Sequence, residues 1–288
     1  MLGQTYSRVE IVVVDDGSTD ETPSIAQGFG DRVRVVRQDN LGANAARNHG
    51  VRLAGGAYVA FLDADDAWLP EKLARQVAVL EENPEAGAVH CDSLRVDPGG
   101  RPLPESNRKP KQSKNNWVFD EFFKHNLSVI LTSTVLIRKA CFDIVGPLDE
   151  TGEVVDDHDF FLRLAWHYSI HYIPEPLVRY RVVQRSLSRQ DAVRRVEQHK
   201  AVIERAIAAH PEHFAGKTTE LLDRWQRFSR WAGVLLYYNG HAREARRYLQ
   251  SALPLGGQVW LYYAASWLPQ SLRHLIRRVH SSASTTRR

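Results

Sequence analysis

A chain of 288 residues that is 43% hydrophobic and 25% charged has the composition of a globular protein, and it is long enough for one large domain with an appendage. Its two cysteines, Cys91 and Cys141, are too few for a disulfide framework, so we expect buried thiols in a reduced, cytoplasmic protein. No apolar stretch reaches about 18 residues, so no membrane-spanning helix is predicted.

The charges are unevenly distributed along the chain. The net charge is +4, but residues 186–288 carry 17 Lys/Arg against 7 Asp/Glu, whereas residues 1–185 carry 21 against 27. An acidic body suits a bound cation, and a basic tail suits an anionic surface. Because no recognised nucleic-acid motif accompanies the tail, we expect no nucleic-acid partner and a peripheral position on the anionic inner face of the cell membrane.

In chain order, the first half alternates short β-branched runs with helical patterns. Residues 9–16 are apolar without alternation, as strands buried on both faces are, and Pro23 lies in or near the first turn of the next helix. Such alternation predicts an α/β fold, with a mostly parallel sheet, right-handed crossovers and helices on both faces. Further strands are expected at 33–38, 58–65 and 86–93, and helices at 18–29, 43–54 and 70–83.

Beyond this region the pattern changes. Residues 95–116 are polar, basic and rich in Pro and Gly, which predicts a long loop. Regular structure is expected to resume at 133–146, to continue to 176–182, and to be helical from about residue 190. The aromatic segment 258–269 is too short to span a membrane, and it is expected either to lie in a membrane interface or to pack against its own domain.

Aspartates gather where two of the expected strands end. Asp15 and Asp16 close the first strand, and Asp63, Asp65 and Asp66 close the third. The carboxyl ends of parallel strands meet at one edge of a sheet, where α/β proteins bind ligands. The alternative is that these aspartates only cap the helices that follow. An Asp-x-Asp at a strand end suits Mg²⁺ or Mn²⁺ bound together with a diphosphate, which would relieve the repulsion among the carboxylates.

Three segments of the sequence resemble the family-2 glycosyltransferases of the GT-A fold. They are "QTYSRVEIVVVDDGSTDET", "QDNLGANAARNHGVRLAGGAYVAFLDADDAWLPEKL" and "DDHDFFLRLA", and they occur in the family's order and spacing. The resemblance implies a Rossmann-like GT-A catalytic domain at 1–188 and a helical, basic extension at 189–288. It also implies transfer of a sugar, usually with inversion, from a nucleoside-diphosphate sugar (a UDP-sugar is expected) to a glycan or lipid-linked acceptor in cell-surface polysaccharide or glycolipid biosynthesis.

The resemblance assigns five residues to the donor side of the site. Asp16, helped by Asp15, would hold the base or ribose of the nucleotide, and Arg47 would lie near the diphosphate or the base. Asp63 and Asp65 match the family's metal-binding Asp-x-Asp, so Mg²⁺ or Mn²⁺ is the implied cofactor and Asp63 also faces the donor. For Arg47 the alternative is an exposed charge on a helix.

The segment "DDHDFFLR" stands where the family has a Glu-Asp-x-Asp motif. The resemblance places Asp157 at the catalytic base, with Asp156 beside it and Arg163 in a supporting ion pair. Inversion needs a base on the face opposite the diphosphate, where carboxylates committed to a metal do not serve. The alternative is that residues 156–159 form only an acidic N-cap for a helix, a role that suits Asp159.

The chain departs from the family pattern in three places. Family members begin with a strand and turn before the helix in which this chain starts. Either the true start lies upstream, or the chain lacks part of its donor site, in which case we expect an exposed sheet edge. "GPLDE" at 146–150 replaces a common Gly-Gly-Phe-Asp-Glu. Val183 stands where a His often follows Tyr-Arg, and Arg181, Gln184 or Arg185 is a candidate to replace it electrostatically.

Three other functions are considered. Sugar nucleotidyltransferases also combine a parallel sheet with metal-binding aspartates, but the Gly-rich basic loop that opens them is not visible here. A phosphatase with an Asp-x-Asp nucleophile would carry further motifs, which are also missing. The third is a degenerate, catalytically impaired GT-A domain kept as a binding partner; the missing first strand favours it, and the aspartates at 16, 63, 65 and 157 oppose it.

Overall fold

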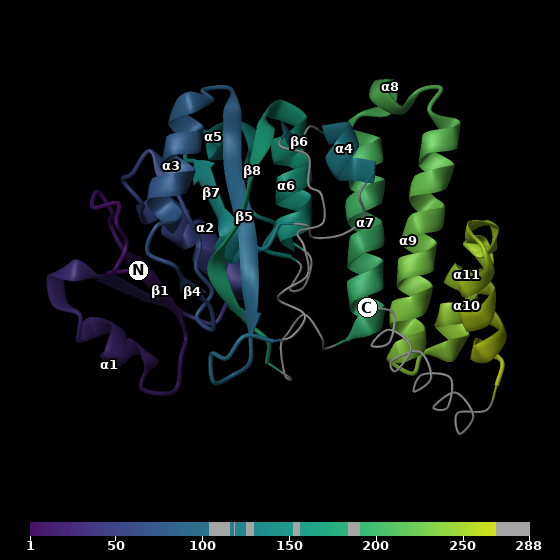
Figure 1. Ribbon diagram of the computed structural model, residues 1–288, viewed down its shortest axis with the longest axis horizontal. Helices are drawn as coiled ribbons and strands as arrows, with labels where there is room; N and C mark the ends of the chain where they lie inside the picture. Colours follow the sequence, from purple (N-terminus) through teal and green to yellow (C-terminus); the bar gives the residue numbers. More distant parts are fainter. Residues whose placement is uncertain (104–115, 118, 125–129, 152–155, 184–190, 269–288) are drawn as a thin grey trace. The chain divides into compact units, whose positions relative to one another are not determined.

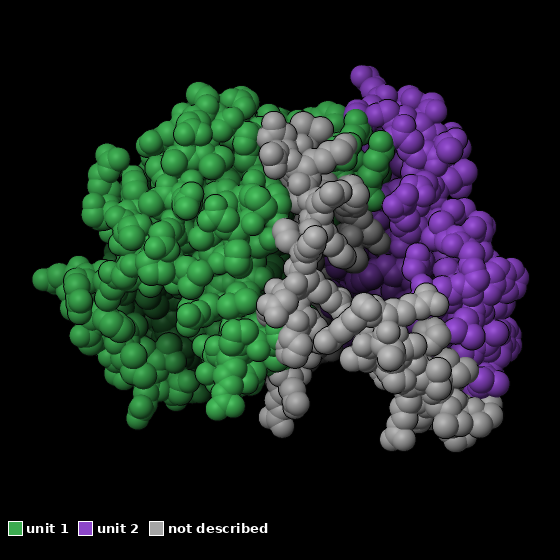
Figure 2. Space-filling view, in the orientation of Figure 1, with its two compact units in different colours: residues 1–187 green, residues 188–288 purple. Residues whose placement is uncertain are grey.

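The computed structural model describes residues 1–103, 116–117, 119–124, 130–151, 156–183 and 191–268 (Figure 1). The chain divides into two compact units, Met1–Leu187 (unit 1) and Ser188–Arg288 (unit 2), which are coloured separately in Figure 2. Most of the loop expected at 95–116 lies outside the described residues, and its first two residues belong to a strand.

Unit 1 contains two sheets. Strand β1 (Val12–Asp16) pairs in parallel with β2 (Arg34–Gln38), and these two strands form a sheet of their own. Within the described residues β1 has a strand on one side only. The larger sheet has the order β3-β7-β5-β8-β4, with β6 also paired to β8. Its strands are β3 (Tyr58–Val59), β4 (Ala67–Trp68), β5 (Ala86–Val96), β6 (Asn116–Trp117), β7 (Val135–Arg138) and β8 (Ser169–Arg181).

The strand pairing is more mixed than the sequence pattern predicts. The β1–β2 and β5–β8 pairs are parallel, whereas β7 is antiparallel to both neighbours and β4 is antiparallel to β8. The parallel prediction rested on strand–helix alternation up to residue 93, and β7 and β8 come from later segments that lack this alternation. The strand expected at 58–65 is also interrupted, because it leaves the sheet after Val59 in a turn that carries its aspartates.

Helix α3 (Lys72–Glu82) packs against the larger sheet, and its bounds agree within two residues with the helix predicted at 70–83 (Figure 1). Leu73, Val77 and Leu80 are spaced by four and three residues, so they share one face of the helix. That face is buried against apolar side chains of β5, β7 and β8. This core holds the start of α3 in a fixed position beneath the aspartate turn.

Both cysteines are buried free thiols, as predicted. Cys91 belongs to the α3 core, and Cys141 begins α5 (Cys141–Val145). Burial raises the pKa of each thiol to about 11, so neither residue is a thiolate at neutral pH. The cysteines are therefore structural residues and not candidate nucleophiles.

Two helices carry residues of the candidate site. The first, α2 (Ala43–Leu53), confirms the helix predicted at 43–54. The second, α6 (Asp156–His167), buries Phe160 completely, and this ring stacks on Phe142 of α5 at a centroid distance of 5.0 Å. The packing fixes the first turn of α6. In the part of unit 1 that the structure describes, the remaining helices are α1 (Thr22–Gln27) and α4 (Phe119–Lys124), with the 3-10 turns η1 (Gly30–Arg32) and η3 (Thr132–Thr134).

Unit 2 is helical, as the pattern from residue 190 predicts. Gly233 of α9 lies against α10, and a Cβ there would meet Leu249 Cγ at 2.5 Å, so glycine permits the close approach of these two helices. Among the described residues, no helix is both long and apolar enough to cross a membrane. The elements are α7 (Ala192–Ala209), α8 (Pro211–Phe214), α9 (Thr218–Tyr238), α10 (Ala242–Ser251), η5 (Leu253–Leu255) and α11 (Gly257–Ser266).

Candidate active site

The aspartate turn, residues 63–66, connects β3 to β4. Asp66 N donates to the carbonyl of Asp63 at 3.0 Å, which closes the turn, and Asp63 N donates to Ser133 Oγ at 3.1 Å. Arg181, at the end of β8, donates from its backbone N to Asp66 Oδ1 at 3.0 Å and from Nε to the carbonyl of Asp65 at 2.9 Å. The turn is therefore held on two sides. Arg181 was considered from the sequence, and it does lie beside the aspartates.

The carboxylates of this turn differ in burial and in how many hydrogen bonds and ion pairs they make. Asp66 is half-buried, and its burial raises its pKa, to which the charges of Asp65 and Asp63 add. Asp65 is exposed, and its carboxylate takes part in no hydrogen bond or ion pair with the described residues. The Asp63 side chain is 37% exposed. Two oxygen donors that still face solvent, in a turn with excess negative charge, fit a hard divalent cation.

Arg47 of α2 reaches the aspartate turn. Its Nη2 lies 2.6 Å from Asp63 Oδ1, and its Nη1 donates to Asn44 Oδ1 at 2.9 Å. The side chain of Arg47 is only 21% exposed, so it is not the solvated helix charge that was its alternative. The guanidinium of Arg47 therefore lies beside the Asp63 carboxylate, where a diphosphate bound at the aspartate turn could contact it.

Asp157, in the first turn of α6, belongs to the same group of side chains. Its Oδ2 accepts from Thr132 Oγ1 at 3.4 Å. Burial raises the pKa of this carboxyl, the positive charge of Arg47 lowers it, and the negative charge of Asp63 raises it again. Arg47, Asp63 and Asp157 thus influence one another although they are far apart in the sequence. The side chain of Asp156 lies outside the described residues.

The segment Thr132–Val135, which comprises η3 and the first residue of β7, supports this group and was not predicted from the sequence. The Ser133 carbonyl accepts from Trp68 Nε1 at 2.8 Å. The Thr134 carbonyl accepts from Gln76 Nε2 at 2.7 Å. Thr132 Oγ1 donates to the Asp157 carboxylate and Ser133 Oγ accepts from the backbone N of Asp63, so one short segment contacts both residues. Three hydroxyl residues directly before an apolar strand were the available signal.

Beneath this segment lies a buried lysine. Lys72 is fully buried; its Nζ donates to Gln76 Oε1 at 2.7 Å and to the Val135 carbonyl at 3.5 Å, and it lies 4.1 Å from the centre of the Trp68 ring. Burial lowers the pKa of Lys72 to about 7. The amine of Lys72 therefore links α3 to the Thr132–Val135 segment through its hydrogen bonds to Gln76 and Val135.

Asp15 and Asp16 make other hydrogen bonds than the aspartates of residues 63–66. Asp16 accepts from Gln38 Nε2 at 2.8 Å and from the backbone N atoms of Leu41 and Gly42, both at 2.9 Å, so it fixes the entry into α2. Asp15 is buried and accepts from Ser18 N at 3.0 Å. Hydrogen bonding from Ser18, first from its side chain and then from its backbone N, lowers the pKa of the Asp15 carboxyl. Within the described residues, no hydrogen bond or ion pair joins these two aspartates to the group around Asp63.

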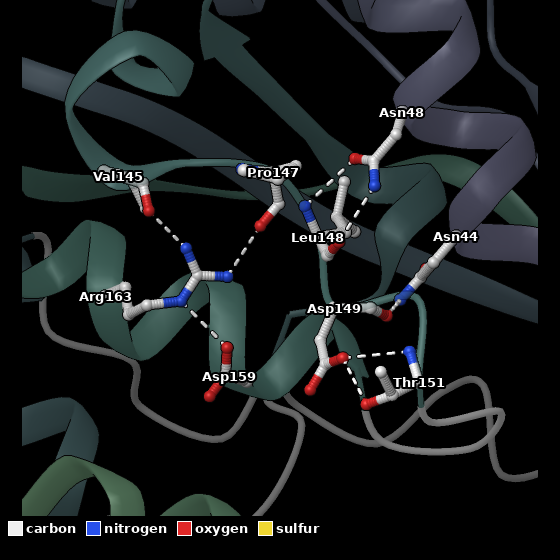
Figure 3. Close-up of polar contacts among 9 residues, drawn as sticks. All are labelled: Asn44, Asn48, Val145, Pro147, Leu148, Asp149, Thr151, Asp159 and Arg163. Atoms are coloured by element: carbon white, nitrogen blue, oxygen red, sulfur yellow. Dashed lines mark hydrogen bonds and ion pairs between the residues drawn. The ribbon is translucent and has the colours of Figure 1, made fainter.

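The loop after α5, residues 146–151, is clamped by α2 on one side (Figure 3). Asn48 Nδ2 donates to the Leu148 carbonyl at 2.8 Å, and Leu148 N donates back to Asn48 Oδ1 at 3.0 Å. Asn44 Nδ2 donates to the Asp149 carbonyl at 2.8 Å. Asn44 also accepts from Arg47, so the helix that holds the arginine holds this loop too.

From the other side the loop is held by α6. Arg163 pairs with Asp159 at 2.8 Å and donates to the carbonyls of Pro147, at 2.8 Å, and Val145 (Figure 3). The expected ion pair of Arg163 thus involves Asp159, and no contact joins Arg163 to Asp157 within the described residues. Its support for Asp157 is indirect, through the position of α6.

Within the described residues, no three His, Cys, Asp or Glu side chains gather as a metal-ion cluster. Magnesium and manganese sites do not need such a cluster, because one or two carboxylates commonly share the ion with substrate phosphates and water. Asp63 and Asp65 are of this kind. Their donor set therefore fits the metal that the sequence implies.

Comparison with known proteins establishes the family. The pattern of Glycosyl transferase family 2 matches residues 1–136. The Bacillus subtilis glycosyltransferase TuaG, assigned to teichuronic acid biosynthesis, is 31% identical over 192 residues, which cover 65% of this chain and 73% of TuaG. The chain belongs to glycosyltransferase family 2. An uncharacterised glycosyltransferase of Rickettsia prowazekii is also 31% identical, over 63% of this family-2 chain and 57% of the relative, so the chain spans less than two thirds of that relative's length.

Solved structures confirm the fold of this family-2 member. The mannosyltransferase PcManGT of Pyrobaculum calidifontis, in complex with GDP-Man and Mn²⁺, superposes with a TM-score of 0.57 at 21% identity over 95% of this chain and 76% of that one. S. aureus TarS, residues 1–349, in complex with UDP-GlcNAc gives a TM-score of 0.55 at 15% identity over 96% and 85%. The predicted GT-A fold with a helical C-terminal part is therefore confirmed.

Proposed function

We propose that the protein is a metal-dependent glycosyltransferase that moves a sugar from a nucleoside diphosphate to a glycan or lipid-linked acceptor with inversion, in cell-surface polysaccharide or glycolipid biosynthesis. The observation that carries the proposal is the group formed by Arg47, Asp63 and Asp157. It joins a carboxylate suited to a metal, a cation suited to a diphosphate, and a separate carboxyl group whose environment raises its pKa. Each of these three elements promotes displacement of a diphosphate by a hydroxyl, two by stabilising the leaving group and one by taking the proton.

On the donor side, Asp63 and Asp65 would hold Mg²⁺ or Mn²⁺ through their solvent-facing oxygens. The metal, when bound, would neutralise the negative charge that develops on the departing diphosphate. Arg47 would exchange part of its pairing with Asp63 for the diphosphate oxygens, since a guanidinium binds phosphate as readily as carboxylate. Asp16 and Asp15 would hold the nucleotide, for which the lone pairs left over from their present hydrogen bonds are available.

On the acceptor side, Asp157 would take the proton of the attacking hydroxyl as the bond to the anomeric carbon forms. A raised pKa makes a carboxylate a stronger base, and the Thr132 hydroxyl fixes one of its oxygens. Loop 146–151, which is held by α2 and by the helix that carries Asp157, is proposed to border the acceptor.

The proposed donor is based on the ligands of structural neighbours, and the proposed cellular location is based on the charge of residues 186–288. Structural neighbours were solved with UDP, UDP-GlcNAc and GDP-Man, and we propose a UDP-sugar donor for this chain. Mn²⁺ accompanies GDP-Man in the PcManGT structure. We further propose a cytoplasmic enzyme held peripherally at the inner face of the cell membrane, on the basis of the net +10 over residues 186–288.

The change Asp65→Ala tests the proposal. Transfer from UDP-sugars in the presence of Mn²⁺ should become undetectable, since a metal ligand is lost, while thermal stability is unchanged because the Asp65 carboxylate has no partner within the described residues. Asp20→Ala, at another exposed aspartate, is the matched control and should retain full activity. Full activity of Asp65→Ala, or of the wild type in excess chelator, would refute the metal site. Failure of the wild type to bind UDP with Mn²⁺ would favour the degenerate binding domain instead.

A further inference from the structure

Helix α11 is apolar on its exposed side as well as on its buried side. Val259, Tyr262 and Ala265 point into unit 2 and are at most 7% exposed. The residues between them face solvent, and no residue from 256 to 268 is charged. We define the α11 face as four exposed side chains: Trp260 (54% exposed), Leu261 (40%), Ala264 and Trp267 (63%).

The fold of unit 2 does not require this face. The buried side of α11 already packs on α9, where Tyr262 Oη lies 3.1 Å from Tyr238 Oη. An amphipathic helix at a protein surface normally presents charged or polar residues to water, and α11 presents two tryptophans and a leucine. Exposed apolar patches of this kind mark surfaces that meet a partner or a membrane. The side chains are therefore placed for binding rather than for stability.

Arginines flank the α11 face at both of its ends. Near the start of the helix, Arg230 Nη2 donates to Gln258 Oε1 at 2.9 Å. Near its end, the Arg246 guanidinium lies 4.3 Å from the centre of the Trp267 ring and donates to the Ser266 carbonyl at 3.4 Å. From Arg224 to the C-terminus the sequence holds eleven arginines and a single acidic residue. Within the described residues, Arg230 and Arg246 thus place positive charge at the two ends of the apolar face.

We propose that the α11 face docks unit 2 onto an anionic lipid surface, with α11 lying in the plane of the interface. Trp260, Leu261 and Trp267 would enter the headgroup region, where amphipathic aromatic rings are favoured, and Arg230 and Arg246 would meet lipid phosphates. The ten residues of α11 are about 15 Å long, too short to span a bilayer. A second copy fits less well, because it would bring arginines against arginines. This inference rests on the proposed peripheral location and names the surface responsible for it. Because lipid binding does not require sugar transfer, it can fail while the proposed catalytic activity stands.

The test is co-sedimentation of the full chain with phosphatidylcholine vesicles that contain or lack phosphatidylglycerol. Binding should be strong only with the anionic lipid, and Trp260→Ser/Trp267→Ser should weaken it by roughly tenfold or more, since each ring loses burial in the interface. Arg230→Gln and Arg246→Gln should each weaken it about fivefold, and added salt should weaken it further. Leu222→Ser, at a residue of α9 that is 57% exposed and lies outside the α11 face, is the control and should bind like the wild type.

Circular dichroism identifies any variant that fails to fold, and brominated lipids provide a second measurement that does not depend on affinity. The lipids should quench the wild-type tryptophan fluorescence, and this quenching should be lost in the double variant. Equal binding to both vesicle types, or undiminished binding and quenching of the double variant, would overturn the proposal. It would also be overturned if the wild type were dimeric in solution and the double variant monomeric, because the α11 face would then be a contact between copies.

Discussion

The two groups of aspartates in unit 1 occupy equivalent places in the sequence, each directly after an apolar run of residues, but the structure uses them differently. Asp16 accepts three hydrogen bonds, two of them from backbone N atoms before α2. Asp65 exposes its carboxylate, and Asp63 offers one oxygen to Arg47. The hydrogen bonds of Asp16 make its carboxylate a structural group that keeps only part of its lone pairs for the proposed nucleotide contact, whereas the Asp65 carboxylate is fully open to a ligand. The same motif can therefore serve either purpose.

The largest effect on stability should come from the first group. Asp16→Ala removes three hydrogen bonds to a charged acceptor and leaves two N–H groups of the loop before α2 without a partner. We expect the free energy of unfolding to fall by about 2–4 kcal/mol, because bonds to charged groups contribute about 1.5–3 kcal/mol each and water replaces part of the loss. Urea unfolding measures this change. A loss of stability for Asp65→Ala as large as that for Asp16→Ala would remove the distinction between the groups.

A smaller effect on the free energy of unfolding should come from Lys72, which contacts the Thr132–Val135 segment behind the Asp63 group. Burial lowers the pKa of Lys72 to about 7, whereas an unfolded lysine titrates near its ordinary value of about 10.4. Between these values the unfolded state binds more protons, so Lys72 makes the free energy of unfolding rise with pH, by at most about 1.4 kcal/mol per pH unit. Lys72→Met should remove this contribution.

Urea unfolding of the wild type and Lys72→Met at pH 7, 8 and 9 provides the measurement. The difference between the two proteins should change steadily in favour of the wild type as pH rises, because groups common to both cancel. Gln76→Ala is a control that perturbs the same layer without removing the titrating amine, so it should keep the wild-type slope. If the free energies of unfolding of the wild type and Lys72→Met changed in parallel with pH, the lowered pKa of Lys72 would be contradicted.

The sequence predicts those features of unit 1 that depend on neighbours in the chain. Helices α2 and α3 follow from periodicity, and the aspartates follow from their position at strand ends. The contacts that complete the site join distant residues: Ser133 meets Asp63 across 70 positions, and Asn48 meets Leu148 across 100. Local patterns carry no information about such pairs.

The resemblance to a family supplied what local patterns could not. It named Arg47 and Asp157, which the structure brings into one group with Asp63. It did not indicate the Thr132–Val135 segment or Lys72, and it paired Arg163 with no particular partner. Within the described residues, the strand expected at 58–65 pairs with the sheet only at Tyr58 and Val59, and its aspartates form a turn at 63–66, a geometry that Asp residues favour.

The central claim is that Asp157 acts as a base toward a donor held by the Asp63 group, and the transfer rate of Asp157→Asn measured against pH tests it most directly. Burial raises the pKa of Asp157, so the wild-type rate should rise with pH through that raised pKa as the carboxyl loses its proton. In Asp157→Asn this acid limb should disappear and the rate should fall by about 10²–10⁴-fold, with binding of UDP and Mn²⁺ unchanged. Asp159→Asn, in the same helix turn but paired with Arg163, should keep the limb and most of the rate. A normal rate and an unchanged acid limb in Asp157→Asn would contradict the account.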